Sequence, residues 1–234
     1  MISQVRTALI HTFPKHLLID LYDMVVARAL AAYEMVRDHA RLDEKRAREL
    51  VGQARFRMLE KGFQEVCELH GGIRLQDDLI PGTDLRVFQP FMRFQGPEIG
   101  VIFGLASMPE RRAVPSRNQS RSAGVTLNYD LVPRFDFDGS GPKPGDIFVL
   151  FLVARDPTRA GKVDEVAIGL VNSAYVSFML YEPIEEFLAG YATDPGGGPP
   201  SPAPTLVTLK RTPKPFVPPE VPSEDTGEEG SSTA

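Results

Sequence analysis

The residues best suited to contact a phosphate group lie between Met108 and Ala123. This stretch holds four arginines among small polar residues, and its only acidic residue is Glu110. Guanidinium groups donate paired hydrogen bonds to phosphate oxygens, and a loop between two strands would present them. An ordinary solvated loop explains the same composition, and no aromatic residue lies inside the stretch to stack a base. The arginine-rich loop (108–123) is therefore one candidate nucleic-acid contact, made by Arg111, Arg112, Arg117 and Arg121.

A second pattern places oxygen-bearing side chains at alternate positions next to a glycine. Asp136, Asp138 and Ser140 surround Gly139 in a way that is similar to the beginning of a calcium-binding loop, so Ca²⁺ or Mg²⁺ could bind there. The similarity ends after six residues, because the twelfth position, which needs a bidentate glutamate, falls on Ile147. A polar turn between two strands accounts for the same residues and is the favoured interpretation.

Carboxylates at the ends of predicted strands raise a third possibility, a magnesium-dependent nuclease. Such a site needs several carboxylates at neighbouring strand ends and commonly a lysine beside the attacking water. No acidic-x-lysine pair lies inside a strand, and turn chemistry explains the same acids equally well. The candidates are Asp130, Asp146, Asp164 and Glu165, with Lys162 close by.

Sequence signatures of other enzyme classes are absent. The chain contains no Gly-x-x-x-x-Gly-Lys-Ser/Thr phosphate loop and no Gly-x-Ser-x-Gly nucleophile elbow. Cys67 and His70 share a helix face, but we expect Cys67 to be a core residue. The first hypothesis is therefore a non-enzymatic binding or regulatory protein acting through a macromolecular partner, most simply another protein. Nucleic-acid binding or metal-dependent nucleic-acid processing is the alternative.

The first 70 residues predict helices. Helices are expected near residues 14–39 and 43–70, with Asp43 as the N-cap of the second and Gly71-Gly72 as its end. Two long helices joined by a short turn suggest a helical hairpin. The segment Lys15–Arg37 is apolar around most of its circumference, which predicts a buried helix.

After Gly72 the pattern changes to short runs of Val, Ile, Phe and Leu between turn residues. The connections lack room for repeated crossover helices, so a mainly antiparallel sheet of about five strands is expected. Another strand could lie at Ala174–Tyr181, followed by a short helix after Pro183. The five predicted strands are Leu85–Phe94, Glu98–Ala106, Gly124–Leu131, Asp146–Ala154 and Glu165–Val171.

Together these patterns predict an α+β domain over residues 1–192, helical over 1–70 and a sheet over 73–192. Residues 193–234 are rich in proline, with six acidic and three basic residues, which predicts a disordered tail. The net charge is −5, and Cys67 is the only cysteine, so no intrachain disulfide can form. With no signal peptide and no apolar run of membrane-spanning length, we expect a cytoplasmic protein without a membrane partner.

Truncation after Tyr191 is expected to leave the melting temperature nearly unchanged, because the predicted tail buries too little apolar surface to stabilise the domain. Calorimetry of the full and truncated chains checks this. A large drop in melting temperature would show that residues 193–234 pack against the domain.

Overall fold

Three helices precede the sheet in the computed structural model, which describes residues 2–75, 89–97, 99–131 and 145–192. They are α1 (Ile2–Thr12), α2 (Lys15–His39) and α3 (Glu44–Leu69), so both predicted long helices are confirmed and α1 is added. Asp43 caps α3 as expected, since its Oδ1 accepts a hydrogen bond of 3.1 Å from Arg46 N. Gly71, at φ +85°, ends the helix in a conformation that glycine adopts without strain.

Helix α2 is buried on one face only. Leu17, Leu21 and Val25 are fully inaccessible, whereas Ile19 and Val26 on the other face are 37% and 38% exposed. The predicted burial of this helix is therefore only partial, because α2 packs against α3, α5 and β5 and leaves its remaining face to solvent. No described helix combines the length and apolar character that a membrane crossing requires.

The sheet has six strands in the order β1-β2-β3-β4-β5-β6. All neighbours are antiparallel except β3 and β4, which are parallel, so two three-stranded meanders join through a central parallel pair. The predicted α+β class with a mainly antiparallel sheet is confirmed, with one strand more than expected. The strands are β1 (Ile73–Arg74), β2 (Met92–Gln95), β3 (Gly100–Met108), β4 (Ile147–Arg155), β5 (Val163–Val171) and β6 (Phe178–Pro183).

The strand predicted at Gly124–Leu131 is wrong. The segment forms α4 (Gln119–Val125) and the 3-10 helix η2 (Thr126–Leu131), which lie within the crossover between the parallel strands β3 and β4. Asn118 caps α4, because its Oδ1 accepts a 2.8 Å hydrogen bond from Arg121 N. A Cβ on Gly124 would lie 2.7 Å from the Phe148 ring, so glycine lets the helix approach the sheet closely.

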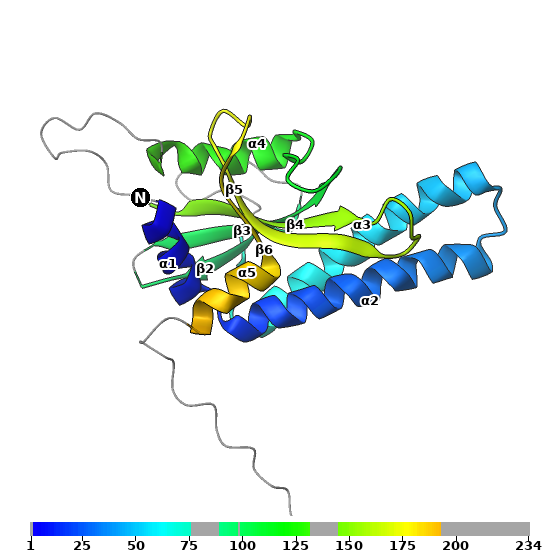
Figure 1. Cartoon of the computed structure of the whole chain (residues 1–234), viewed down its shortest axis with the longest axis horizontal. Coiled ribbons are helices and arrows are strands. Elements are labelled where there is room, and N and C mark those ends of the chain that lie inside the picture. Colours follow the sequence, from blue (N-terminus) through cyan, green and yellow to red (C-terminus); the bar gives the residue numbers. More distant parts are fainter. Residues whose placement is uncertain (1, 76–88, 98, 132–144, 193–234) are drawn as a thin grey trace, which may run out of the picture. The chain divides into compact units, whose positions relative to one another are not determined.

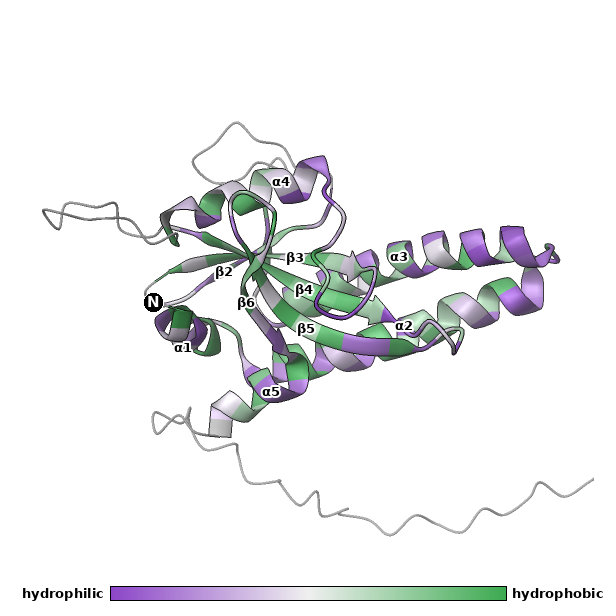
Figure 2. Cartoon of the chain, turned by 45° about the horizontal axis from the view of Figure 1, so that its top comes forward, coloured by the Kyte–Doolittle hydropathy of each residue, from purple (hydrophilic) through white to green (hydrophobic). Residues whose placement is uncertain are grey.

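Helices cover both faces of the sheet (Figure 1). One core lies beneath α1, α2, α3 and the closing helix α5 (Ile184–Ala189), and Phe103 packs there against Phe13 at 4.5 Å between ring centroids. The second core lies beneath α4 and includes Phe91 and Phe148. Figure 2 shows the sheet as the apolar centre and the distal turns of α2 and α3 as predominantly hydrophilic.

Asn128 of η2 joins the crossover to the sheet. The β4–β5 ladder ends at the pair Leu150–Gly169, and if it continued in the same register Phe148 would lie opposite Val171, two residues further along. Asn128, with no exposed surface, occupies this gap. Its Nδ2 donates to the carbonyls of Phe148 and Val171 at 3.0 and 2.8 Å, and its Oδ1 accepts from Phe148 N at 2.8 Å. One side chain thus replaces the missing ladder hydrogen bonds.

Candidate functional site

The first two predicted arginines lie beside Tyr181. Arg111 donates two 2.7 Å hydrogen bonds to the carboxylate of Asp164, which raises the pKa of the guanidinium and lowers that of Asp164. Arg112 has a left-handed backbone, at φ +59°, and its guanidinium lies 5.9 Å from the ring centre of Tyr181. Arg111 is therefore neutralised by an acidic partner, and Arg112 is not.

The other two arginines lie near Tyr175. Arg117 donates from Nε to Ser122 Oγ at 3.0 Å and lies 6.0 Å from the Tyr175 ring centre. Arg121 is only 6% exposed, and residues 119–123 belong to α4. The sequence predicted that residues 108–123 form one loop, but the structure differs at both ends of this segment. Met108 is the last residue of β3, and residues 119–123 are helical.

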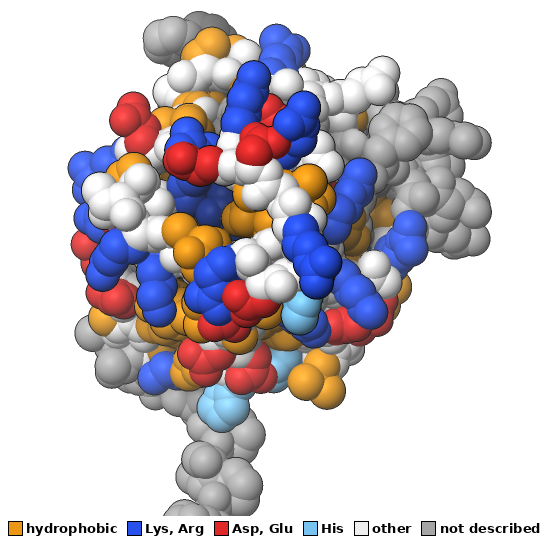
Figure 3. Space-filling model, turned by 90° about the vertical axis from the view of Figure 1, so that its right-hand side faces the viewer, with side chains coloured by type: hydrophobic (Ala, Val, Ile, Leu, Met, Phe, Trp, Pro, Cys, Tyr) orange, Lys and Arg blue, Asp and Glu red, His pale blue; other side chains and the backbone are white. Residues whose placement is uncertain are grey.

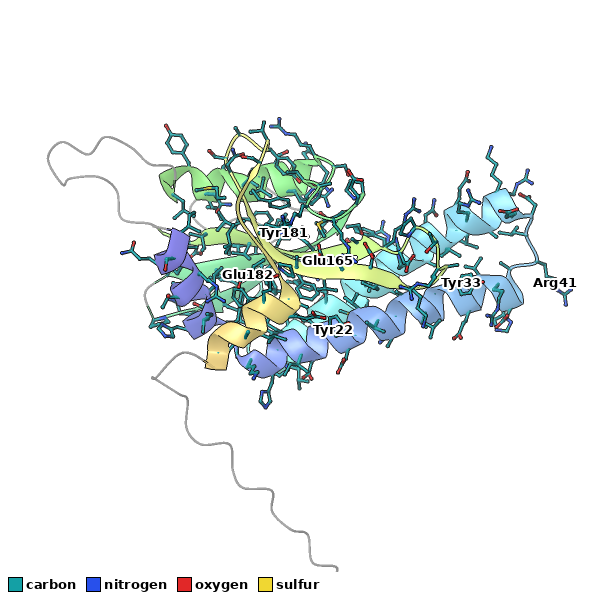
Figure 4. All side chains as sticks on the ribbon, in the orientation of Figure 1. Tyr22, Tyr33, Arg41, Glu165, Tyr181 and Glu182 are labelled. Atoms are coloured by element: carbon teal, nitrogen blue, oxygen red, sulfur yellow. The ribbon has the colours of Figure 1, made fainter. Side chains whose placement is uncertain are left out.

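The predicted strand-end carboxylates do not converge. Asp146, at the start of β4, forms two hydrogen bonds with Arg93 at 2.8 and 3.0 Å. Glu165 lies opposite Ala154, so Glu165 and Asp164 are at the other end of β4. Glu165 accepts a hydrogen bond from Tyr181 (Figure 4), and burial, followed by this bond, raises the pKa of Tyr181 to about 12.

No described residues form a group of three or more His, Cys, Asp or Glu that could hold a metal ion. The candidate ligands Asp136, Asp138 and Ser140 lie outside the described residues, and the side chain of Asp130 is also outside them. Cys67 is fully buried, as expected, and burial raises the pKa of its thiol.

A larger set of cations, which the sequence did not reveal as a group, gathers at one end of the domain. We call this the basic end: residues 33–57 of the α2–α3 hairpin, residues 109–121, and residues 155–165 around the β4–β5 turn. These segments hold 14 Lys or Arg against nine Asp or Glu, although the whole chain has a net charge of −5. Figure 3 shows this end, with Lys and Arg side chains around a hollow that holds another such side chain.

Contacts between distant segments bring the basic end together. Gly161 of the β4–β5 turn packs so closely on α2 that a Cβ on it would lie 2.9 Å from Cβ of Tyr33. The Arg111–Asp164 ion pair joins residues 109–121 to β5. Arg41 lies at the tip of the α2–α3 hairpin and projects outward (Figure 4). The hairpin and the β4–β5 turn therefore present their charges on the same end.

Several cations of the basic end have no acidic partner. Arg55, half-buried on α3, lies near Arg155, and its pKa is lowered first by burial and then by the positive charge of Arg155. The two positive charges are thus close enough to interact, and Arg55 forms no ion pair with a described carboxylate. The cations of this end that form no ion pair with a described residue are Arg41, Lys45, Arg55, Arg112, Arg117, Arg121, Arg155 and Lys162.

Asp156 holds the β4–β5 turn in shape. Its Oδ1 accepts hydrogen bonds from Thr158 Oγ1 and Thr158 N at 2.8 and 2.9 Å and from Arg159 N at 2.9 Å. Its Oδ2 accepts a further bond from Arg159 Nε at 2.5 Å. The bonds from Thr158, followed by those from Arg159, hold the pKa of Asp156 below its usual range.

We expect Asp156→Asn to destabilise the protein at neutral pH, by an amount that shrinks under acidic conditions. Because the folded-state pKa is below the unfolded value, the contribution of Asp156 is complete above about pH 5 and is lost as the pH falls through about 4 and below. Urea unfolding of both proteins between neutral pH and about pH 3 measures this difference. A difference that stays constant over that range would contradict the assignment.

Comparison of the chain with protein-family models, curated protein sequences and solved structures finds no match. The basic end is therefore interpreted from its own geometry.

Proposed function

We propose that this is a non-enzymatic binding protein whose basic end binds the phosphate backbone of a nucleic acid. The observation that carries the proposal is the gathering of 14 Lys and Arg residues from three separate segments, eight of them without a described acidic partner. Local positive potential of this kind attracts a polyanion even when the protein as a whole is acidic.

The pair Arg55 and Arg155 supports a phosphate ligand in particular. Two nearby like charges repel each other, and burial of one of them makes the missing counter-charge more costly. A backbone phosphate placed between them would offset their repulsion with its negative charge, and guanidinium groups match phosphate oxygens with paired hydrogen bonds. Arg41 and Lys45 at the hairpin tip are exposed and form no ion pair with any described residue, so they can contact an extended strand.

The described carboxylates support binding without chemistry. Asp146 and Asp164 each form an ion pair with an arginine, and Glu165 accepts a hydrogen bond from Tyr181. Each carboxylate therefore already holds two segments of the fold together. We accordingly expect a bound strand to remain intact when Mg²⁺ is added.

The proposal is tested by fluorescence anisotropy with labelled single-stranded RNA and duplex DNA, over a series of KCl concentrations from about 50 to 300 mM. Binding that weakens steeply with salt is the expected result, with no cleavage products in Mg²⁺. Absence of binding to either nucleic acid at the lowest salt concentration would overturn the proposal.

An acidic protein segment is the competing partner for a basic surface. Polyglutamate of the same charge as the RNA distinguishes the two in a competition experiment. Tighter binding of the RNA than of polyglutamate is the result that a nucleic-acid interface predicts. Displacement of the RNA by an equal concentration of polyglutamate would contradict the nucleic-acid proposal and favour a protein partner.

A further inference from the structure

A pocket of about 470 Å³ lies between α3 and the segment that leads into α4. Its lining comes from the end of β3, from residue 89 before β2, from α3 and from residues 116–121. The only carboxylate in the lining is Glu60, which is 7% exposed and forms a 2.9 Å ion pair with Arg57. Its charge is therefore already balanced within the protein.

The polar side chains of the pocket support one another. Gln89 donates to Glu60 at 3.4 Å and accepts from Asn118 Nδ2 at 3.1 Å. Asn118 in turn caps α4 by accepting from Arg121 N. These bonds fix the wall that carries Arg121. A pocket with a supported wall can hold a ligand in one orientation, because its groups do not need to be ordered on binding.

Arg121 is the unbalanced charge of this pocket. Only 6% of its surface is exposed, and no described carboxylate pairs with it. Its Nη2 donates to the Ser116 carbonyl at 2.6 Å, but its buried Nε has no hydrogen-bond partner. The neighbouring Tyr175 hydroxyl is also buried and interacts with Arg121, although the contact does not meet normal hydrogen-bond geometry. Burying a guanidinium without a counter-ion costs folding free energy. The ligand that would balance the charge of this pocket is therefore an anion.

We infer that the pocket binds a phosphate monoester carried by a ligand of about nucleotide size. Arg121 would supply the positive charge, and Ser107, Ser116 and Gln119 add hydrogen-bonding groups in the lining. The volume falls in the range of small-molecule sites and exceeds what a single phosphate ion needs. The identity of the ligand in this inference rests on the proposed function. That function concerns phosphates along the backbone of a strand, whereas the pocket would bind a terminal phosphate.

The test uses adenosine 5′-monophosphate, adenosine and inorganic phosphate at constant ionic strength, with isothermal calorimetry on the full chain. We expect the monophosphate to bind and adenosine not to bind. Arg121→Gln should weaken binding by about tenfold or more, since it removes the only unpaired charge in the lining. Lys15→Gln, which removes an exposed cation outside both the pocket lining and the basic end, is the matched control and should bind as the wild type does.

A second variant keeps the test valid if Arg121→Gln folds poorly. Gln119→Glu changes an exposed residue and gives Arg121 an acidic neighbour in the same lining, so it should also weaken monophosphate binding by about tenfold. Thermal unfolding of each variant shows that it remains folded. Equal binding by wild type and by either folded variant would overturn the inference, as would equal binding of adenosine and its monophosphate.

Oligonucleotides separate this inference from the proposed function and identify the source of the phosphate. A short RNA with a 5′-phosphate is compared with the same RNA ending in a hydroxyl. Tighter binding of the phosphorylated strand, lost in Arg121→Gln, assigns the pocket to strand ends; monophosphate binding without this preference assigns it to free nucleotides. Salt-dependent RNA binding with no monophosphate binding would refute the pocket inference alone.

Discussion

Replacing Asn128 by alanine is expected to lower the free energy of unfolding by about 3–5 kcal/mol. The substitution leaves three buried backbone groups without partners: the N–H and C=O of Phe148 and the C=O of Val171. Each such group costs about 1–3 kcal/mol when it is buried and unpaired. Because β5 does not pair with β4 beyond Leu150–Gly169, no neighbouring strand can take over these bonds.

Urea unfolding measures this effect, and Asn172 provides the matched control. Its side chain donates to Ser177 Oγ at 3.0 Å and accepts from Val176 N at 2.9 Å, but these bonds are exposed. Water can replace them, so Asn172→Ala should cost only about 1 kcal/mol. Similar losses in the two variants would show that Asn128 does not replace the missing ladder bonds.

Reversing two charges at the tip of the basic end is expected to weaken RNA binding by about 30-fold or more at low salt. The double variant is Arg41→Glu with Lys45→Glu, which changes two exposed cations that form no ion pair within the described part of the chain. Both positions then repel phosphates instead of attracting them. Because neither side chain contributes to the core, the fold should be retained.

A control with the same change in net charge separates a local effect from a general one. Lys15→Glu with Arg28→Glu reverses two exposed cations of α2 that lie outside the basic end. Lys15 is 26 residues from Arg41, and along a helix this corresponds to roughly 39 Å. We expect the control to bind RNA within about threefold of the wild type at moderate salt. Equal weakening by both double variants would indicate a response to net charge alone.

The sequence predicts those elements whose signals are local. Asp43 and Gly71 mark the ends of α3 because capping depends on residues within one helical turn. The same kind of signal was present at Asn118, whose hydrogen bond to Arg121 N begins α4. The apolar residues that follow nevertheless resemble a strand, because alternating and helical spacing are hard to distinguish in a short run. The close packing of Gly124 on Phe148 in the folded chain favours the helix over the strand.

The candidate site depends on contacts that a linear pattern does not show. The arginines of residues 108–123 attract notice because they are close in sequence, yet Arg111 is neutralised by Asp164, 53 residues away. Conversely, Arg55 and Arg155 become neighbours only when the β4–β5 turn lies near α3. Which charges are paired and which are free is thus a property of the folded chain, and no spacing rule reveals it.

The central claim, that the basic end binds a phosphate backbone, is tested most directly by the salt dependence of RNA binding in the two double variants. Each phosphate contact to a single strand contributes about 0.7 to the slope of log K against log salt concentration. We predict that Arg41→Glu with Lys45→Glu reduces this slope by about 1–2, whereas Lys15→Glu with Arg28→Glu leaves it unchanged. Identical slopes for the two variants would contradict the assignment of nucleic-acid binding to the basic end.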